Sequence, residues 1–222
     1  MFLQGVQFLL KGGWVMWPLL LCALTSVTVM IERGIVYLRA TEDYPRLLAT
    51  VRQCLREQNA PAALQACRQS RGPVAVVLAR GLAAYDKGLE LTAIERAMED
   101  SALREIPPLE KRLGMLDTII TLSPLLGLLG TISGMISSFK IVAIATGSDT
   151  GMAITGGVAE ALICTATGLT VAIITLPFYN YYNGRLKGFV SDMEISATEL
   201  LTVLDTPASS SPAEQSHALT QA

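Results

Sequence analysis

The chain has 222 residues, of which 51% are apolar and only 16% are charged, and its mean hydropathy is +0.44. The charged fraction lies well below the roughly 25% of ordinary soluble domains, and a net charge of −2 gives no basic footprint for nucleic acid. The single histidine, His217, lies in a polar tail, and the spacing of the four cysteines fits neither a zinc site nor a dense disulfide framework. These features exclude most histidine-based catalysis and metal binding. They predict a membrane protein without a resident cofactor rather than a soluble enzyme.

Charged residues are absent from long stretches of the chain. Residues 12–31 and 118–139 carry none, and residues 150–184 carry only Glu160. Each stretch reaches the about 20 residues that an α-helix needs to cross the roughly 30 Å hydrocarbon core of a bilayer. The alternation of apolar and polar residues that marks a membrane β-barrel is absent. The sequence therefore predicts an all-α integral membrane protein with three transmembrane helices.

Positive charges predict how these helices are oriented. Residues 39–112 hold 12 of the 17 lysines and arginines, whereas the connection 143–149 holds none. The positive-inside rule therefore places 39–112 and the C-terminus in the cytoplasm and the N-terminus in the periplasm. Apolar residues recur at helical spacing through 39–112, which predicts a helical cytoplasmic loop, and again through 184–205, which predicts that the third span continues into the cytoplasm.

The predicted organisation divides the chain into eight segments. They are a periplasmic interfacial helix (1–12), transmembrane helix one (13–38), the cytoplasmic helical loop (39–112), transmembrane helix two (113–142), a periplasmic hairpin (143–150), transmembrane helix three (151–183), a cytoplasmic helical extension (184–205) and a disordered tail (206–222).

The second span carries a stripe of small and polar residues. On an ideal helix its members fall within an arc of about 80°, and Gly130 with Gly134 forms a G-x-x-x-G pair. Two interpretations remain open, because small residues let helix backbones pack closely and a polar stripe is also suited to face a narrow conduit. The pore-lining or helix-packing candidates on this span are Ser123, Gly127, Gly130, Gly134 and Ser138, with Thr131 beside them.

Glu160 is the ionisable residue of the third span. It lies ten residues into the stretch, about 15 Å along a helix, and a carboxylate at membrane depth costs several kcal/mol unless it is protonated, paired or facing water. A carboxyl group that gains and loses its proton is what a proton path requires. Thr167 and Cys164 lie about 20° and 40° from it around the helix and continue a weakly polar line. If the span begins near Val158, Glu160 is instead a first-turn acid at the outer interface.

Another acid lies at the inner end of the second span. Asp117 follows Lys111 and Arg112 closely in the sequence. We expect a local ion pair there in preference to a role in conduction.

Two motifs carry a resemblance to a known family. The run SPLLGLLGTISGMISSF (123–139), followed across a short hairpin by GGVAEALICTATGLTVAI (156–173), resembles the ExbB/TolQ proton channel family, distantly related to the MotA motor stators. The three-span layout with a large loop after the first span is also similar, and the chain is closer to ExbB than to MotA. It departs from the family at Ile174, where proline is common, with Pro177 following instead.

This resemblance implies a function and partners. Family members form a homopentamer whose lumen holds the single transmembrane helices of an ExbD/TolR-like partner with one membrane aspartate. Proton flow between them drives rotation and work on a TonB- or TolA-like protein, which implies a proton-conducting stator subunit of the bacterial inner membrane with protons as the coupling ion. Glu160 matches the family's membrane acid, Thr131 the threonine of GLLGT, and Thr165 the threonine of AEAL-x-x-T. Thr165 lies about 140° from Glu160 on an ideal helix, so the two cannot face one point without distortion or a second interface.

Other functions remain open on the sequence alone. The chain is also compatible with a non-conducting membrane scaffold, in which Glu160 only orients a partner helix, and with a TolQ-type subunit for envelope integrity or cell division. A secondary transporter is disfavoured, because three spans offer no inverted repeats. The sequence does not distinguish siderophore, haem or vitamin uptake from other energised processes.

Overall fold

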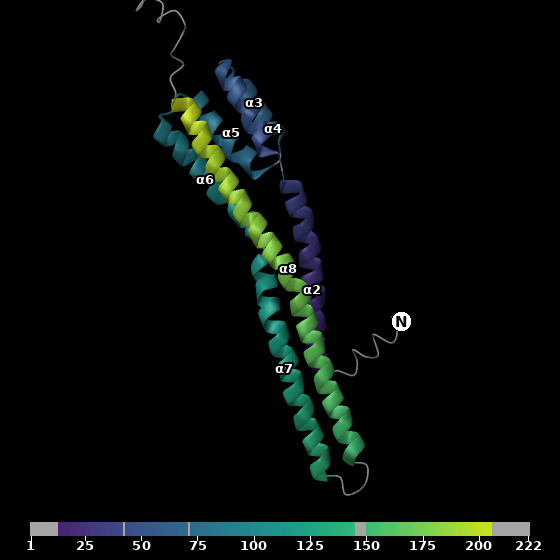
Figure 1. Ribbon diagram of the computed structural model, residues 1–222. Coiled ribbons are helices and arrows are strands. Elements are labelled where there is room, and N and C mark those ends of the chain that lie inside the picture. Colours follow the sequence, from purple (N-terminus) through teal and green to yellow (C-terminus); the bar gives the residue numbers. More distant parts are fainter. Residues whose placement is uncertain (1–12, 42, 71, 145–149, 206–222) are drawn as a thin grey trace, which may run out of the picture. The chain divides into compact units, whose positions relative to one another are not determined.

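The computed structural model describes residues 13–41, 43–70, 72–144 and 150–205. Every regular element in these ranges is an α-helix (Figure 1). The interfacial helix predicted at 1–12, the centre of the hairpin at 145–149 and the tail at 206–222 lie outside the described residues. The helices are α2 (Met16–Ala40), α3 (Tyr44–Arg56), α4 (Ala60–Gln69), α5 (Pro73–Asp86), α6 (Leu91–Glu110), α7 (Leu113–Ile144) and α8 (Thr150–Asp205).

The all-helical prediction with three membrane-spanning helices is confirmed. Three helical stretches of the described chain are long and apolar enough to cross a membrane, and they cover α2, most of α7 and most of α8 respectively. The chain divides into two compact units. We call residues 1–35 with 110–184 the membrane unit and residues 36–109 with 185–222 the charged unit.

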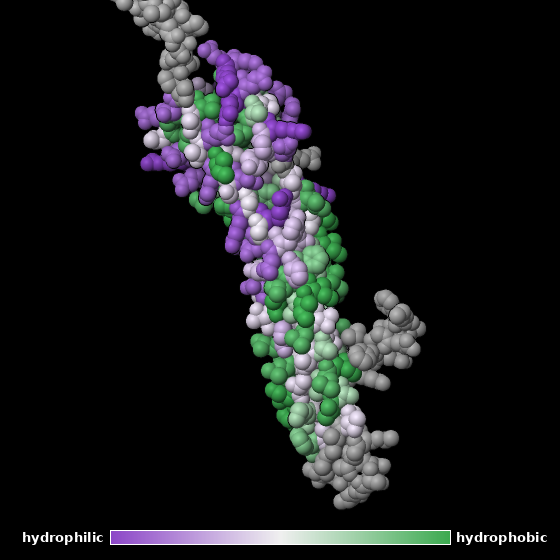
Figure 2. Space-filling model, in the orientation of Figure 1, coloured by the Kyte–Doolittle hydropathy of each residue, from purple (hydrophilic) through white to green (hydrophobic). Residues whose placement is uncertain are grey.

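In the membrane unit, α2, α7 and the first part of α8 run side by side (Figure 1). Small residues form the contacts between α7 and α8, where the backbones approach so closely that a Cβ added at Gly134 would lie 2.8 Å from the Gly157 carbonyl oxygen. Large apolar side chains point outward instead, including Leu24, Phe139 and Ile173, each more than 60% exposed. An apolar exterior therefore covers this unit (Figure 2), as lipid requires of a spanning bundle.

The charged unit has the opposite arrangement. Helices α3–α6 and the end of α8 enclose an aliphatic core, and hydrophilic side chains dominate the face seen in Figure 2. Burial of apolar side chains away from water stabilises such a unit. Its most deeply buried large side chains are Leu78, Leu82, Ile94, Met98, Met193 and Leu200.

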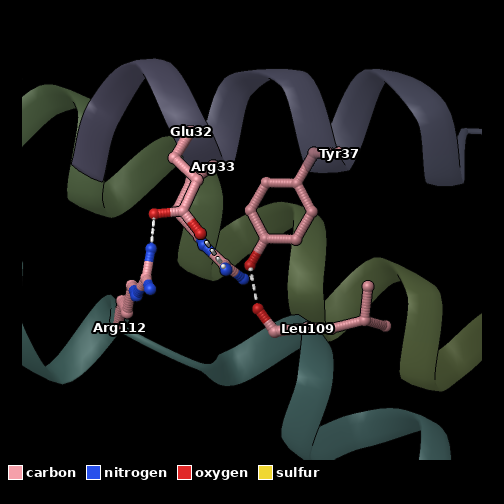
Figure 3. A network of polar contacts seen from close by, with 5 residues as sticks. All are labelled: Glu32, Arg33, Tyr37, Leu109 and Arg112. Carbon is pink, nitrogen blue, oxygen red and sulfur yellow. Dashed lines mark hydrogen bonds and ion pairs between the residues drawn. The ribbon is translucent and has the colours of Figure 1, made fainter. Parts of the chain in front are cut away.

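Helix α6 ends at an irregular junction. It continues through Pro107 and Pro108 to Glu110, and Arg112 then adopts a left-handed φ of 66° before α7 begins. The last carbonyl groups of a helix lack intrahelical partners. In the charged unit, the buried Tyr37 hydroxyl donates a hydrogen bond to one of them, the Leu109 carbonyl, at 3.0 Å (Figure 3).

Candidate functional site

Glu160 lies within the membrane unit on α8, about three turns after this helix begins at Thr150. It is therefore not a first-turn residue of the helix. Its side chain is half-buried, and among the described residues it forms neither a hydrogen bond nor an ion pair.

The carboxyl group of Glu160 lies close to Gly13. A Cβ atom added at Gly13 would overlap Oε1 of Glu160 and would lie 3.1 Å from its Cδ. Gly13 lies three residues before α2 begins at Met16. The start of the first span is thus in contact with the acid of the third. Apart from two adjacent glycines, nothing in the sequence indicates this proximity.

Thr165 faces a different neighbour. Its hydroxyl donates to the Gly127 carbonyl of α7 at 3.1 Å and, more weakly, to the Ala161 carbonyl of its own helix at 3.4 Å. A Cβ at Gly127 would lie 3.0 Å from the Cα of Thr165. Thr165 therefore lies in the contact between α7 and α8, away from the Gly13 contact of Glu160, which fits the angular separation expected on a regular helix.

Thr131 and Thr167 are each bonded within their own helix. The Thr131 hydroxyl donates to the Leu128 carbonyl at 2.7 Å, and the Thr167 hydroxyl donates to the Ile163 carbonyl at 2.8 Å. Both side chains are half-buried. The described contacts do not join Glu160, Thr131 and Thr165 into one cluster.

The small-residue stripe of the second span is buried against α8. Gly130 lies against Cys164, which is buried with Val15, Met16 and Leu19 of the first span. The Ser123 carbonyl lies against Gly168. Within α7 itself, the Ser138 hydroxyl donates to the Gly134 carbonyl at 3.0 Å. The buried members of the stripe are Ser123, Gly127, Gly130, Gly134 and Ser138.

Two polar contacts join α2 to α8 inside the membrane unit. The hydroxyls of Ser26 and Thr175 are fully buried and 2.6 Å apart, at hydrogen-bonding distance. Nearer the charged unit in sequence, the buried Tyr182 hydroxyl donates to the Met30 carbonyl at 2.7 Å. The sequence indicated a polar line on α8 but not which residue of the first span meets it.

An ion-pair cluster lies where α2 and the start of α7 approach each other in the membrane unit (Figure 3). Arg33 is only 3% exposed and pairs with Glu32 at 3.1 Å, and Arg112 pairs with the same carboxylate. The local ion pair expected for Asp117 is wrong, because Asp117 is exposed and forms no ion pair with any described residue. Arg112 instead pairs with an acid 80 residues upstream, which sequence proximity does not reveal.

The ranges that the structure describes hold no group of three or more histidine, cysteine, aspartate or glutamate side chains arranged for a metal ion. Within the uncharged stretches 12–31 and 118–139 and the stretch 150–184, the groups available for chemistry are the Glu160 carboxyl group, several hydroxyls and closely packed backbone. These groups are suited to proton exchange and hydrogen bonding.

Comparison with known proteins identifies the family. The MotA/TolQ/ExbB proton channel family matches residues 69–195, more than half of the chain. A putative ExbB-like biopolymer transport protein of Synechocystis sp. is 36% identical over 175 residues, which cover 78% of this chain and 82% of the relative.

Other relatives are matched over a smaller share of their length. A putative ExbB homologue of Methanothermobacter thermautotrophicus is 33% identical over 68% of this chain, which spans about half (52%) of that relative. The Tol-Pal system protein TolQ of Haemophilus influenzae is 37% identical over 109 residues, or 49% of this chain and 47% of that protein. With its three membrane-spanning helices and this match, the chain is a multi-pass membrane protein that belongs to the MotA/TolQ/ExbB proton channel family, a family of channels and not of enzymes.

Proposed function

We propose that the chain is the proton-conducting stator subunit of a bacterial inner-membrane motor. With an ExbD/TolR-like partner, it uses the proton-motive force to energise a TonB- or TolA-like protein that acts on the outer membrane, for example in siderophore, haem or vitamin uptake. The observation that carries this proposal is Glu160, an acid on an otherwise uncharged membrane helix, half-buried and without a structural ion pair among the described residues. The names of the relatives, which describe biopolymer transport, support the same function.

The proposed topology places the N-terminus in the periplasm and residues 39–112 and 184–205 in the cytoplasm. The distribution of lysine and arginine supports this orientation. In the proposed assembly, several copies, five by analogy with the family, surround a lumen that admits the single membrane helix of the partner. Thr131 and Thr165 are proposed to support the proton path beside Glu160, and Ser123, Gly127, Gly130, Gly134, Ser138, Cys164 and Thr167 to line it or to pack the helices around it.

The energetics of proton transfer support a partner that carries an acidic residue of its own. Moving one charge through 100 mV releases about 2.3 kcal/mol, so several protons are enough for a mechanical step. One carboxyl group at membrane depth cannot relay protons across the whole bilayer. A membrane aspartate on the partner would supply the second exchange group.

The test is the substitution Glu160→Gln, which keeps the shape of the side chain and removes its titration. We expect the complex to assemble at the normal stoichiometry, measured by native mass spectrometry, while proton-dependent work in a complemented deletion strain falls to background. Glu95→Gln is the matched control, because Glu95 is exposed in the charged unit, and it should retain full work. Normal work by Glu160→Gln would refute proton conduction through this residue and favour the non-conducting scaffold.

A TolQ-type role in envelope integrity or cell division is the second candidate. The 37% identity to a TolQ protein of Haemophilus influenzae favours it. The deletion strain separates the two candidates: a TolQ-type subunit predicts a defect in envelope integrity or division, and an ExbB-type subunit predicts a defect in energised uptake with an intact envelope.

A further inference from the structure

The first turn of the first span lies against Glu160. We call residues 13–16 the N-terminal turn; it is closed by a hydrogen bond from the Met16 amide to the Gly13 carbonyl at 3.2 Å. Gly13 adopts a φ of +69°, a conformation that side chains other than glycine's rarely adopt. The turn therefore presents bare backbone to the carboxyl group of Glu160.

The N-terminal turn is fixed to both neighbouring helices. The indole Nε1 of Trp14 donates to the Ser133 hydroxyl of α7 at 3.1 Å. Val15 and Met16 are almost fully buried and pack with Cys164, one helical turn after Glu160 on α8. Because these anchors hold the turn on both sides, it cannot yield easily to a larger side chain at Gly13.

The space at Gly13 is occupied by the carboxyl group itself. An added Cβ would overlap Oε1 of Glu160 and stand 3.1 Å from Cδ and 3.8 Å from Cγ. The side chain of Glu160 would then have to rotate, since the turn is held in place. Any residue larger than glycine at position 13 therefore changes where the carboxyl group resides.

We propose that Gly13 is a positioning residue that gives the Glu160 carboxyl group its resting place against the N-terminal turn. This inference rests on the proposed proton-carrying role of Glu160. The turn covers one side of the carboxyl group, so proton exchange with a partner's acid takes place from the opposite side or after the side chain rotates away. Displacing the carboxyl group permanently from Gly13 would therefore misplace it for exchange without removing its ability to titrate.

The first experiment is Gly13→Ala in the full chain with its partners. We expect proton-dependent work to fall about tenfold while the complex still assembles. Two glycine controls separate the possible causes. Gly156 lies one turn before Glu160 on α8, and Gly88 has a comparable φ of +71°, yet an added Cβ meets no atom within 4 Å at either position. Gly156→Ala and Gly88→Ala should both remain within twofold of wild type.

The second experiment does not depend on activity. Glu160→Asp withdraws the carboxyl group by one methylene, which makes room for the new Cβ. The loss of thermal stability caused by Gly13→Ala should therefore be at least halved when Glu160→Asp is present, and any loss of assembly should be restored. The loss of thermal stability caused by Gly88→Ala should be the same with and without Glu160→Asp.

These measurements can overturn the inference. It fails if the Gly13→Ala variant supports as much proton-dependent work as the Gly156→Ala variant. It also fails if Glu160→Asp leaves the loss of thermal stability caused by Gly13→Ala unchanged. If Glu160→Gln retains normal work, the proposed function fails and the positioning role falls with it. Coupling in thermal stability would then still establish the contact between Gly13 and Glu160 as a purely structural one.

Discussion

Helix α8 belongs to both units and packs in a different way in each. Its buried positions recur mostly every three or four residues in both parts, as expected of one helical face. In the membrane unit they are Ala161, Cys164, Gly168, Ala172 and Thr175, followed by Tyr182 three residues before the charged part begins. In the charged unit they are Leu186, Phe189, Met193, Ser196 and Leu200.

The surrounding solvent explains this difference. In water, burial of large apolar side chains drives association, so the charged unit gathers its leucines and methionines inside. Lipid offers no such drive, and helices associate through close backbone packing and hydrogen bonds between small polar side chains. In both parts of α8 the spacing of buried residues identifies the inner face. From Ala161 to Thr175 these residues are small, whereas from Leu186 to Leu200 most of them are large and apolar.

The largest expected effect comes from placing a large side chain in the small-residue contact. Gly168→Leu would drive its side chain into the Ser123 carbonyl and the Cα of Gly127, and overpacking against backbone costs about 3 kcal/mol or more. We expect little folded protein, measured as the yield of monodisperse complex in detergent. Gly156→Leu is the control, because a side chain there meets open space, and equal yields of the two variants would contradict close packing at Gly168.

A cavity in the charged unit should have the next largest effect. Leu78 is 0% exposed, and Leu78→Ala should lower the free energy of unfolding of this unit by about 2–5 kcal/mol. Hydrogen exchange should report lower protection in α4–α6 with unchanged protection in α7. Val76→Ala on the same helix removes a side chain that is 38% exposed and should cost less than about 0.5 kcal/mol. Similar costs for both variants would argue against the aliphatic core.

The smallest expected effect concerns the hydroxyl pair of the membrane unit. In a double-mutant cycle with Ser26→Ala and Thr175→Val, we expect a coupling energy of about 0.6 kcal/mol, the average for hydrogen bonds between membrane helices. The cycle is measured from unfolding in mixed micelles. Thr28→Ala replaces Ser26→Ala in the control cycle, because the Thr28 hydroxyl donates to its own helix at the Leu24 carbonyl. Coupling of equal size in the control would show that the Ser26–Thr175 bond contributes nothing specific.

Much of the fold was predictable because it depends on local patterns. The uncharged stretches marked the three apolar helices, and α3–α6 lie within 39–112, where apolar residues recur at helical spacing. The helical path through Pro107 and Pro108 was not foreseen. Proline disfavours a helix interior, but the surrounding structure overrides that local preference here.

The candidate site was predictable in part. Glu160 was identifiable from the sequence because one acid in 35 residues is conspicuous. Its contact with Gly13, the bond from Thr165 to Gly127 and the pairing of Arg112 with Glu32 were not, since each joins residues far apart in the chain.

The sequence by itself determined which segments avoid water and which single carboxyl group lies among them, because hydropathy and charge are properties of the residues themselves. Only the tertiary structure decided which side of α8 meets α7 and what lies against Glu160. These contacts depend on how three helices approach one another. Where the facing residues are as small as glycine, serine and alanine, the distance between the helix backbones decides which residues come into contact. A local sequence pattern does not predict that distance.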